Sequence, residues 1–420
     1  MRILYLHQHY SGPGGATATR SHAMAHALTA AGHSVTIACG QYAGAVTGLG
    51  GPFRHGRREG VVRGVKLVEF AIPCGNHQGF ARRTAAFGRF AAAATRLALA
   101  EPWDLVVASS TPLTVAIPAL VAHRLRGTPF LFEIRDPWPE LPRAMKAAPA
   151  LALAAMEPLA TAACRRAAGV VALSEGMAET ALARGADPAR VRVVPNGCDL
   201  DLFGPHIAPW RPPGAAMWEV LAVYAGAHGR ANGLDQLLDA AALLQRQGER
   251  RLRLLLVGEG SEKPRLQQAA LVRGLANVTF LDSLPKQRLA ALLAGAQVGV
   301  QCLAPVPEFA EWTAPNKLMD YLAAGLPVVA NLSGRAARLL AEGHGDSPCG
   351  IATPPGDAAA LAHALTWMAD NPALRGRMGA AGRAQAVRRW DRRLLAADFV
   401  HAAEHAVGLV PAAEASLVAA

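Results

Sequence analysis

The chain has 420 residues, of which 52% are hydrophobic and 17% charged, and its formal net charge is +11. A chain this long and apolar builds two or three folded domains, which excludes an intrinsically disordered protein and a disulfide-stapled miniprotein. The positive charge calls for an acidic partner: a nucleic acid, an anionic membrane or a phosphorylated ligand. Residues 1–205 hold 21 Lys and Arg against 13 Asp and Glu, so most of the excess lies in the first half.

The residue composition narrows the choice among these partners and among classes of protein. The six cysteines are scattered without CxxC spacing, which argues against a zinc ribbon or a disulfide framework and favours a reducing compartment. An aromatic content of 5% leaves few stacking platforms for nucleic acid. The start of the chain does not resemble a signal peptide, and the apolar stretch 105–122 contains two prolines, so a strand, a turn and a helix start explain it better than a membrane span.

Short apolar runs alternate with amphipathic segments, a pattern typical of parallel sheets buried on both faces. A helix is predicted from about Thr19 to Ala31, with Gly32 just after its end. The predicted strands of the first half are Ile3–Leu6, Val35–Ala38, Val65–Phe70, Leu105–Ala108, Phe130–Ile134, Val170–Leu173 and Val191–Val194.

The second half repeats the pattern after a Pro-rich segment, Pro205–Gly214, which predicts a linker. Its predicted strands are Val220–Tyr224, Leu252–Val257, Val278–Leu281, Val298–Cys302 and Val328–Ala330, and its helices begin near Gly233, Leu289, Pro315 and Arg335. The prediction is an α/β protein of two doubly wound, Rossmann-like domains, 1–205 and 206–395, with a C-terminal helix and tail at 396–420. Because ligands of such sheets bind at the carboxyl ends of strands, two facing domains suggest a cleft between them.

Two segments after first-half strands carry candidate chemistry. Gly14 and Gly15 follow the first strand and allow close backbone approach to an anion, although a tight strand-to-helix turn explains them equally well. The run from Glu133 to Glu140 includes Arg135 and Asp136 at the end of a buried strand. Charges there are costly unless they are paired or functional, so a structural Arg–carboxylate network is the alternative.

The segment from Trp312 to Val329 carries the strongest signal in the chain. Pro315 suits the first position of a helix, and Lys317 in the first turn could assist the helix end in holding phosphate. Asp320 follows about one turn later on the same face, placed for a sugar hydroxyl. A surface helix with incidental charges is the alternative for Lys317 alone.

A basic amphipathic helix is predicted over Phe80–Leu99. Its apolar anchors are Phe80, Phe87, Phe90 and Leu97, and its charges are Arg82, Arg83, Arg89 and Arg96. An ordinary helix that covers a sheet, with a solvated basic face, is the favoured interpretation. The functional alternative is contact with an anionic membrane face or a lipid-diphosphate acceptor.

The ordered motifs resemble those of the family 4 glycosyltransferases of GT-B fold, over nearly the whole chain. Within that family the chain is similar to bacterial O-antigen and colanic-acid L-fucosamine transferases. The motifs are Gly14-Gly15, Ala31–Val35, Pro195–Asp199, Val257–Gly260 and Pro315–Val329, and the closer match adds His7–Tyr10, Ser110–Pro112 and Arg135–Pro139.

The resemblance implies a nucleotide-diphosphate sugar held mainly by the C-terminal domain, and a retaining transfer that uses no metal and no cofactor. It implies catalytic roles for Asp136, Arg135 and Lys317. It implies donor-binding roles for Gly14, Gly15, Arg230, Glu259, Lys317, Leu318 and Asp320.

Several departures from the family pattern bear on these roles. Arg135 stands at the end of the fifth strand, where a His is common in the family. Trp312 stands where the first of two paired glutamates is expected, and Asp320 replaces the second. Ala227 and Asn232 occupy the positions of the usual phosphate-binding Arg and Lys, so Arg230 is the nearby candidate substitute.

The expected function is transfer of a sugar, such as N-acetyl-L-fucosamine, from a UDP-sugar to a lipid-linked or lipopolysaccharide acceptor. The protein is expected in the cytoplasm, peripheral on the inner membrane, without nucleic acid. Two alternatives remain open: a sugar-nucleotide epimerase or hydrolase of the same fold, and a non-catalytic nucleotide-sugar-binding partner.

Overall fold

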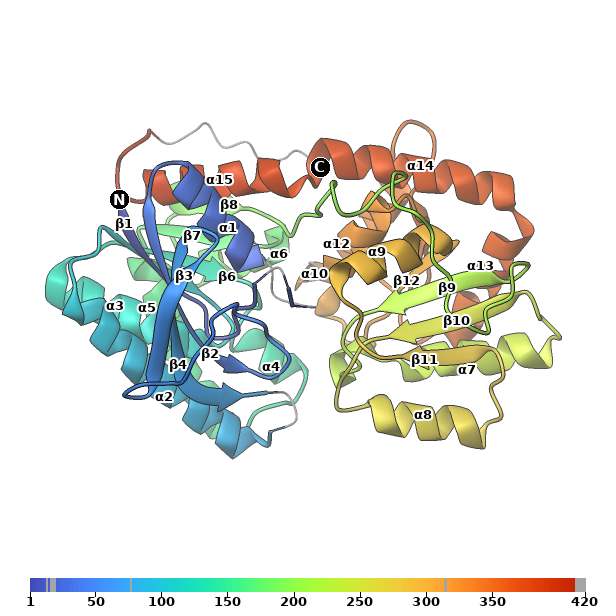
Figure 1. Cartoon of the computed structure of the whole chain (residues 1–420), viewed down its shortest axis with the longest axis horizontal. Helices are drawn as coiled ribbons and strands as arrows, with labels where there is room; N and C mark the ends of the chain where they lie inside the picture. The colour runs from blue at the N-terminus through green and yellow to red at the C-terminus, as the bar shows by residue number, and fades with distance from the viewer. Residues whose placement is uncertain (13, 16–19, 76–77, 313–315, 412–420) are drawn as a thin grey trace. The chain divides into compact units, whose positions relative to one another are not determined.

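The computed structural model describes residues 1–12, 14–15, 20–75, 78–312 and 316–411. Its contacts divide the chain into two compact units, Met1–Pro195 together with Arg393–Ala420 and, between them in sequence, Asn196–Arg392. Each unit is a Rossmann-like α/β domain with a largely parallel sheet, as the alternation of apolar runs predicts (Figure 1).

The sheet of unit 1 has the strand order β3-β4-β2-β1-β5-β6-β7-β8. All neighbouring pairs are parallel except β3 with β4, which is antiparallel. The strands are β1 Arg2–Leu6, β2 Ser34–Tyr42, β3 Arg57–Val62, β4 Val65–Cys74, β5 Leu105–Ser109, β6 Phe130–Ile134, β7 Gly169–Ala172 and β8 Val191–Val193.

Helices cover both faces of this sheet. On one face Met24 and Leu28 of α1 and Phe399 of α15 pack with Tyr5 of β1 in one apolar cluster, and α2, α3 and α5 lie on the other face (Figure 1). The helices are α1 Arg20–Ala30, α2 Phe80–Ala100, α3 Ala116–Arg126, α4 Glu140–Ala144, α5 Ala150–Arg166, α6 Glu175–Ala183 and α15 Arg392–His405, with short 3-10 turns at Leu113–Val115 and Pro188–Arg190.

The sheet of unit 2 is parallel throughout, with the order β11-β10-β9-β12-β13-β14. Its strands are β9 Val220–Ala225, β10 Leu252–Val257, β11 Val278–Leu281, β12 Val298–Gln301, β13 Val328–Ala330 and β14 Gly350–Ala352. Its helices are α7 Asp235–Arg246, α8 Lys263–Val272, α9 Lys286–Gly295, α10 Phe309–Trp312, α11 Asn316–Ala323, α12 Gly334–Glu342, α13 Ala358–Asp370 and α14 Pro372–Arg389, with a 3-10 turn at Arg230–Asn232.

Strand β9 shows why its sequence forms a central strand. Leu221 and Val223 point into one apolar cluster with α9 and α11, while Ala222 and Tyr224 point into a second cluster with α7 and α13. Side chains of a strand alternate between its two faces, so a run that is apolar throughout is stable only where both faces are covered.

The structure corrects the predicted linker. Pro205–Gly214 packs on unit 2, where the Trp210 amide donates to the Ala291 carbonyl at 2.8 Å and Ile207 lies against the core. The units divide at Pro195 and Arg392. The last helix, α15, packs on unit 1 through Phe399.

Smaller differences concern individual elements. Two strands were not predicted: β3, which is charged and half-exposed, and β14, which has only three residues. In α2 the predicted anchors Phe87, Phe90 and Leu97 are buried, but Phe80 is 44% exposed. The expected helix start at Thr19 and the expected first-turn Pro315 lie outside the described residues.

Candidate functional site

The carboxyl end of β6 carries a fully buried ion pair. Glu133 accepts from Arg20 Nε at 2.8 Å, from Tyr5 Oη at 3.0 Å and from Ser109 Oγ at 2.5 Å. The Arg20 guanidinium also donates to the backbone carbonyls of Val194 and Pro195. Burial alone would raise the pKa of Glu133, but the neighbouring arginines outweigh it and lower that pKa. Glu133 and Arg20 both have their partners within the protein, so this part of the predicted cluster is a structural network.

Arg135, predicted to be catalytic, lies beside a buried histidine. Its Nη1 is 2.7 Å from His7 Nε2, and His7 Nδ1 is 2.6 Å from Ser21 Oγ. Because a guanidinium only donates, Nε2 must accept and Nδ1 carries the proton. Burial and the charge of Arg135 lower the pKa of His7 well below its ordinary value. The neutral imidazole therefore holds Arg135 in place at the strand end.

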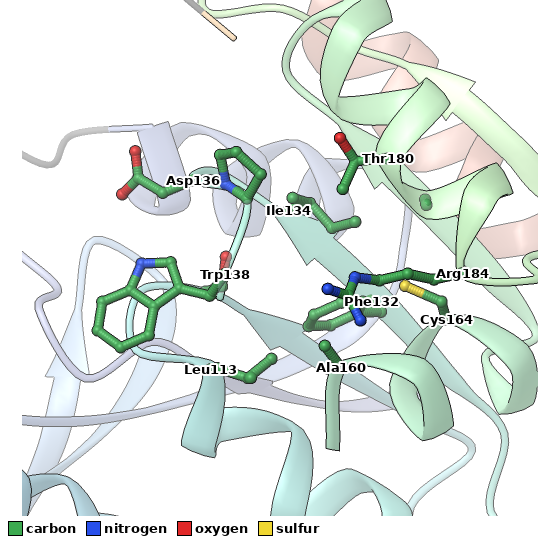
Figure 2. Close-up of a pocket in the computed structure, with 12 residues that line it drawn as sticks. Leu113, Phe132, Ile134, Asp136, Trp138, Ala160, Cys164, Thr180 and Arg184 are labelled. Carbon is green, nitrogen blue, oxygen red and sulfur yellow. The ribbon is translucent and has the colours of Figure 1, made fainter. Parts of the chain in front are cut away.

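Asp136, the second predicted catalytic residue, lies one residue further along. Thr111 Oγ1 donates to its carboxylate at 2.5 Å, and burial raises its pKa. Asp136 and Trp138 lie on one side of a small cavity, with Cys164 and Arg184 across from them (Figure 2). The cavity volume is about 10 Å³, room for about one water, so it is not a sugar site.

The two glycines after β1 have different structural demands. A Cβ on Gly15 would lie 1.9 Å from Ser11 Oγ, whereas a Cβ on Gly14 would meet only a Val46 methyl at 3.6 Å. The Gly15 amide donates to the Gly12 carbonyl, which closes the turn. A side chain at Gly15 would therefore displace the Ser11 hydroxyl, whereas Gly14 has no such neighbour.

In unit 2, Lys317 lies in the first turn of α11 and reaches back to the end of β9. Its Nζ is 3.2 Å from Asn232 Oδ1 and 3.3 Å from Tyr224 Oη, and it stands 4.6 Å from the centre of the Tyr224 ring. No carboxylate of the described residues pairs with it. Burial lowers the pKa of Lys317 to about 8. A half-buried cation with only neutral partners is suited to receive an anionic ligand.

Glycines allow the loop after β9 to lie close to Lys317 and to the loop after β10. A Cβ on Gly226 would lie 2.5 Å from Lys317 Cε, and a Cβ on Gly260 would lie 2.3 Å from the His228 carbonyl oxygen. The loops after β9 and β10 are joined there, because the His228 amide donates to the Glu259 carbonyl at 2.8 Å. Only residues without a side chain allow this contact between the two loops.

Glu259, predicted to bind the donor, is held by a lysine that the sequence analysis did not single out. Lys263 Nζ is 2.7 Å from Glu259 and 2.6 Å from Asp282, and so ties the loop after β10 to the loop after β11. Oppositely charged residues four positions apart often form ion pairs, so the spacing of Glu259 and Lys263 could have suggested the first pair. The Arg230 side chain is 86% exposed, and its Nε is 3.6 Å from Glu262.

Asp320 and Lys317 have different neighbourhoods, although both belong to α11. The charged groups that act on Asp320 are Lys286, Arg392 and Asp199, and burial raises the pKa of Asp320 to about 6. Among the described residues none hydrogen-bonds to its carboxylate. Neither Lys317 nor Asp320 forms an ion pair among the described residues, but Asp320 lies near Lys286 and Arg392, both of which pair with Asp199.

Leu318, predicted to bind the donor, contributes its side chain to the core of unit 2. Its side chain is fully buried in the core cluster that includes Tyr321 and Val223. A ligand in the site can reach only its backbone.

A buried histidine was also missed by the sequence analysis. His228 is fully buried, neither ring nitrogen has a partner, and burial followed by the charge of Lys263 lowers its pKa to about 4. Its position in the loop after β9 was the only signal for it. Over the described residues no group of three His, Cys, Asp or Glu could hold a metal ion.

Two family models match the two halves of the chain. A glycosyl transferase 4-like domain matches residues 15–197, and a domain of the glycosyl transferases group 1 matches residues 219–371. Each unit thus carries a match to a glycosyltransferase domain, and the fold of the chain is of the GT-B type.

Curated relatives match part of the chain. A stretch of 215 residues is 31% identical to a phosphatidyl-myo-inositol mannosyltransferase of Mycobacterium leprae, covering 50% of this chain and 52% of that protein. Another of 209 residues is 32% identical to a D-inositol 3-phosphate glycosyltransferase of Kribbella flavida, covering 47% of each. The chain spans about half the length of the curated relatives it matches.

Solved structures match nearly the whole chain and show its fold. A sucrose-phosphate synthase from Thermosynechococcus elongatus superposes with a TM-score of 0.74 at 19% identity, over 95% of this chain and 97% of that one. Anabaena HepE in complex with UDP-glucose gives 0.65 at 18%, over 96% and 98%. WaaG, a glycosyltransferase involved in lipopolysaccharide biosynthesis, gives 0.66 at 16%, over 96% and 99%.

The described part of the chain contains no helix with the length and apolarity needed to cross a bilayer.

Proposed function

We propose that this protein is a retaining, metal-independent glycosyltransferase that moves a sugar from a UDP-sugar to a lipid-linked or lipopolysaccharide glycan. The observation that carries the proposal is Lys317, a cation at the strand ends of unit 2 whose contacts are all neutral. The proposed sugar is an N-acetylated amino sugar such as N-acetyl-L-fucosamine. HepE, a relative in fold, was solved with UDP-glucose, which supports the donor class.

The chemistry follows from where charge develops. Cleavage of the sugar–phosphate bond leaves negative charge on a diphosphate, and without a metal a cation must stabilise it. In the proposal Lys317 supplies that charge, while Asp320 accepts hydrogen bonds from the ribose hydroxyls. Glu259 and the loop after β11 are proposed to line the nucleotide site, with Lys263 as the residue that positions Glu259.

Unit 1 is proposed to present the acceptor and the reacting sugar. Asp136, with its carboxylate held by Thr111, is the proposed acceptor group for developing positive charge on the sugar. Arg135, fixed by His7, is the proposed partner for the leaving phosphate or the acceptor.

UDP binding tests the donor site. Lys317→Ala and Asp320→Ala should each weaken UDP binding, measured by calorimetry, by about tenfold or more because each removes a hydrogen bond that involves a charged group. Lys146→Ala, on the exposed turn after α4, is the matched control and should leave UDP affinity unchanged. Unchanged UDP affinity in both site variants would refute the donor site.

Product analysis separates the proposed reaction from its rivals. Purified protein with UDP-sugars should release UDP faster when a glycan acceptor is present. Turnover that does not depend on acceptor favours an epimerase or hydrolase, and binding without turnover favours a non-catalytic partner. The names of the curated relatives make inositol phosphates the rival acceptor class, so the acceptor panel includes them.

We propose a peripheral position on the cytoplasmic face of the inner membrane. Phe80 is 44% exposed at the start of α2, and Arg82 beside it is also exposed, a combination that suits an anionic bilayer surface. Arg82→Glu with Arg83→Glu should reduce sedimentation with phosphatidylglycerol vesicles at low salt. If the unaltered protein does not sediment with them, the membrane position is wrong.

A further inference from the structure

Unit 1 contains a large groove far from the strand ends that hold Asp136. The groove has a volume of about 1050 Å³ and lies between the second half of α2 and the β3–β4 hairpin with the loop before it. Strand β3 is an edge strand, and five strand spacings separate it from β6. At about 4.8 Å per spacing, the groove is some 24 Å across the sheet from the Asp136 end.

Arginines line both walls of this groove. Arg89 and Arg96 stand on α2 seven residues apart, which places them two turns or about 10 Å from each other on one face. The small side chains of Ala92 and Ala93 lie between them in sequence and line the groove. Arg54 and Arg57 face them from the hairpin side.

The charge of these arginines is largely uncompensated. Arg54, Arg89 and Arg96 are exposed, and no carboxylate of the described residues pairs with them. Arg57 pairs with Glu59 at 2.9 Å, and Glu59 is the one acidic residue among those that line the groove. The groove therefore keeps a net positive charge along its length.

The shape and lining indicate which anion fits. A flat bilayer does not enter a groove. Single-stranded nucleic acid binds through several exposed aromatic rings, whereas Phe70 in this groove is only 6% exposed and the His55 imidazole is the exposed ring among its described lining residues. The volume is at the upper limit of a small-molecule pocket. Guanidinium groups bind carboxylates in bidentate geometry, which suits a chain with repeated acidic groups.

We propose that this groove binds an acidic glycan chain through its carboxylate groups. The choice of a glycan rests on the proposed glycosyltransferase function, in which the groove would hold a part of the acceptor several sugars from the reacting hydroxyl. The 24 Å span means that one sugar cannot reach both places, so the acceptor is an oligosaccharide.

The test uses an octamer of galacturonic acid as the acidic probe and maltooctaose as the neutral one, with affinity measured by calorimetry at low salt. The intact chain should bind the acidic octamer and not the neutral one, and the affinity should fall as salt rises. Arg89→Glu with Arg96→Glu should weaken binding about tenfold or more, since two ion pairs are lost and become repulsive.

The matched control is Arg124→Glu with Arg166→Glu, two exposed arginines of unit 1 on α3 and α5, outside the groove. This pair changes the net charge equally and should leave binding within about twofold. Equal losses in both pairs, or equal binding of maltooctaose, overturn the proposal. Groove-dependent binding of oligo-dT or of phosphatidylglycerol vesicles, without binding of the acidic octamer, also overturns it.

UDP binding distinguishes this proposal from the function it rests on. The groove variants should bind UDP with unchanged affinity and keep the far-UV circular dichroism of the intact chain. If UDP binding is absent in the intact chain, the proposed function fails, whereas groove-dependent binding of the octamer would still establish the groove.

Discussion

The buried charges at the strand ends of unit 1 and the two charges of α11 in unit 2 differ in how they are paired. In unit 1 the buried Glu133 is matched by Arg20 and two hydroxyls, and His7 and Arg135 satisfy each other. In unit 2 the contacts of Lys317 are neutral, and Asp320 receives no hydrogen bond from the described residues. Internal pairing stabilises a fold and leaves little charge for a ligand, whereas unpaired charge costs stability and is available for binding.

The largest expected effect on stability is that of Glu133→Gln, which disrupts the charge pairing in unit 1. It leaves the buried Arg20 charge uncompensated, so we expect the free energy of unfolding to fall by about 3–5 kcal/mol, measured by urea denaturation at pH 7. Glu101→Gln breaks the exposed pair with Arg2 and should cost about 1 kcal/mol or less. Similar losses in the two variants would mean that the unit 1 network is not the structural element described above.

Gly260→Ala tests whether the close approach of two loops shapes the unit 2 site. The new Cβ would lie 2.3 Å from the His228 carbonyl oxygen, so we expect a loss of about 1–3 kcal/mol in stability together with weaker UDP binding. Gly229→Ala is the control in the same loop region. Its Cβ would meet nothing nearer than Asn232 Nδ2 at 3.7 Å, and its effect should stay within about 0.5 kcal/mol. Equal stability in the two variants would contradict this view of the loops.

The pH dependence of UDP binding gives the smallest and most specific effect. Because burial lowers the pKa of Lys317 to about 8, UDP affinity should fall as pH rises through 8 and the ammonium loses its proton. The same shift should raise the stability of the free protein between pH 8 and the ordinary lysine value of 10.5, since the unfolded chain binds more protons there. Lys317→Met should remove both trends. A flat affinity up to pH 10 in the intact protein would contradict the role of Lys317.

Local patterns predicted four strands well, including β11 at the edge of the unit 2 sheet. The ranges Phe130–Ile134, Leu252–Val257, Val278–Leu281 and Val328–Ala330 are the same in sequence and structure. Most of their residues are apolar because helices cover the sheets, although Glu133, Arg253 and Thr279 interrupt the apolar runs. Strand β3 escaped prediction because it is an edge strand with exposed, charged side chains, and its pairing with β4 decides its conformation.

The predicted linker failed for a related reason. Prolines in Pro205–Gly214 favour extended backbone. They do not reveal that the Trp210 amide donates to the Ala291 carbonyl of α9 and that the segment packs on unit 2. Leu318 was assigned to donor binding through the resemblance, and its burial follows from which side of α11 faces the sheet.

The amino-acid sequence by itself determined the alternation of strands and helices, the two Rossmann-like domains and the position of Lys317 at a helix start, because these depend on local order. Only the tertiary structure decided which charges are paired. Arg20 meets Glu133 across 113 positions, and Lys263 joins Glu259 to Asp282. The strength of a charge in a protein depends on burial and on partners from distant segments, and both are set only when the sheets are assembled.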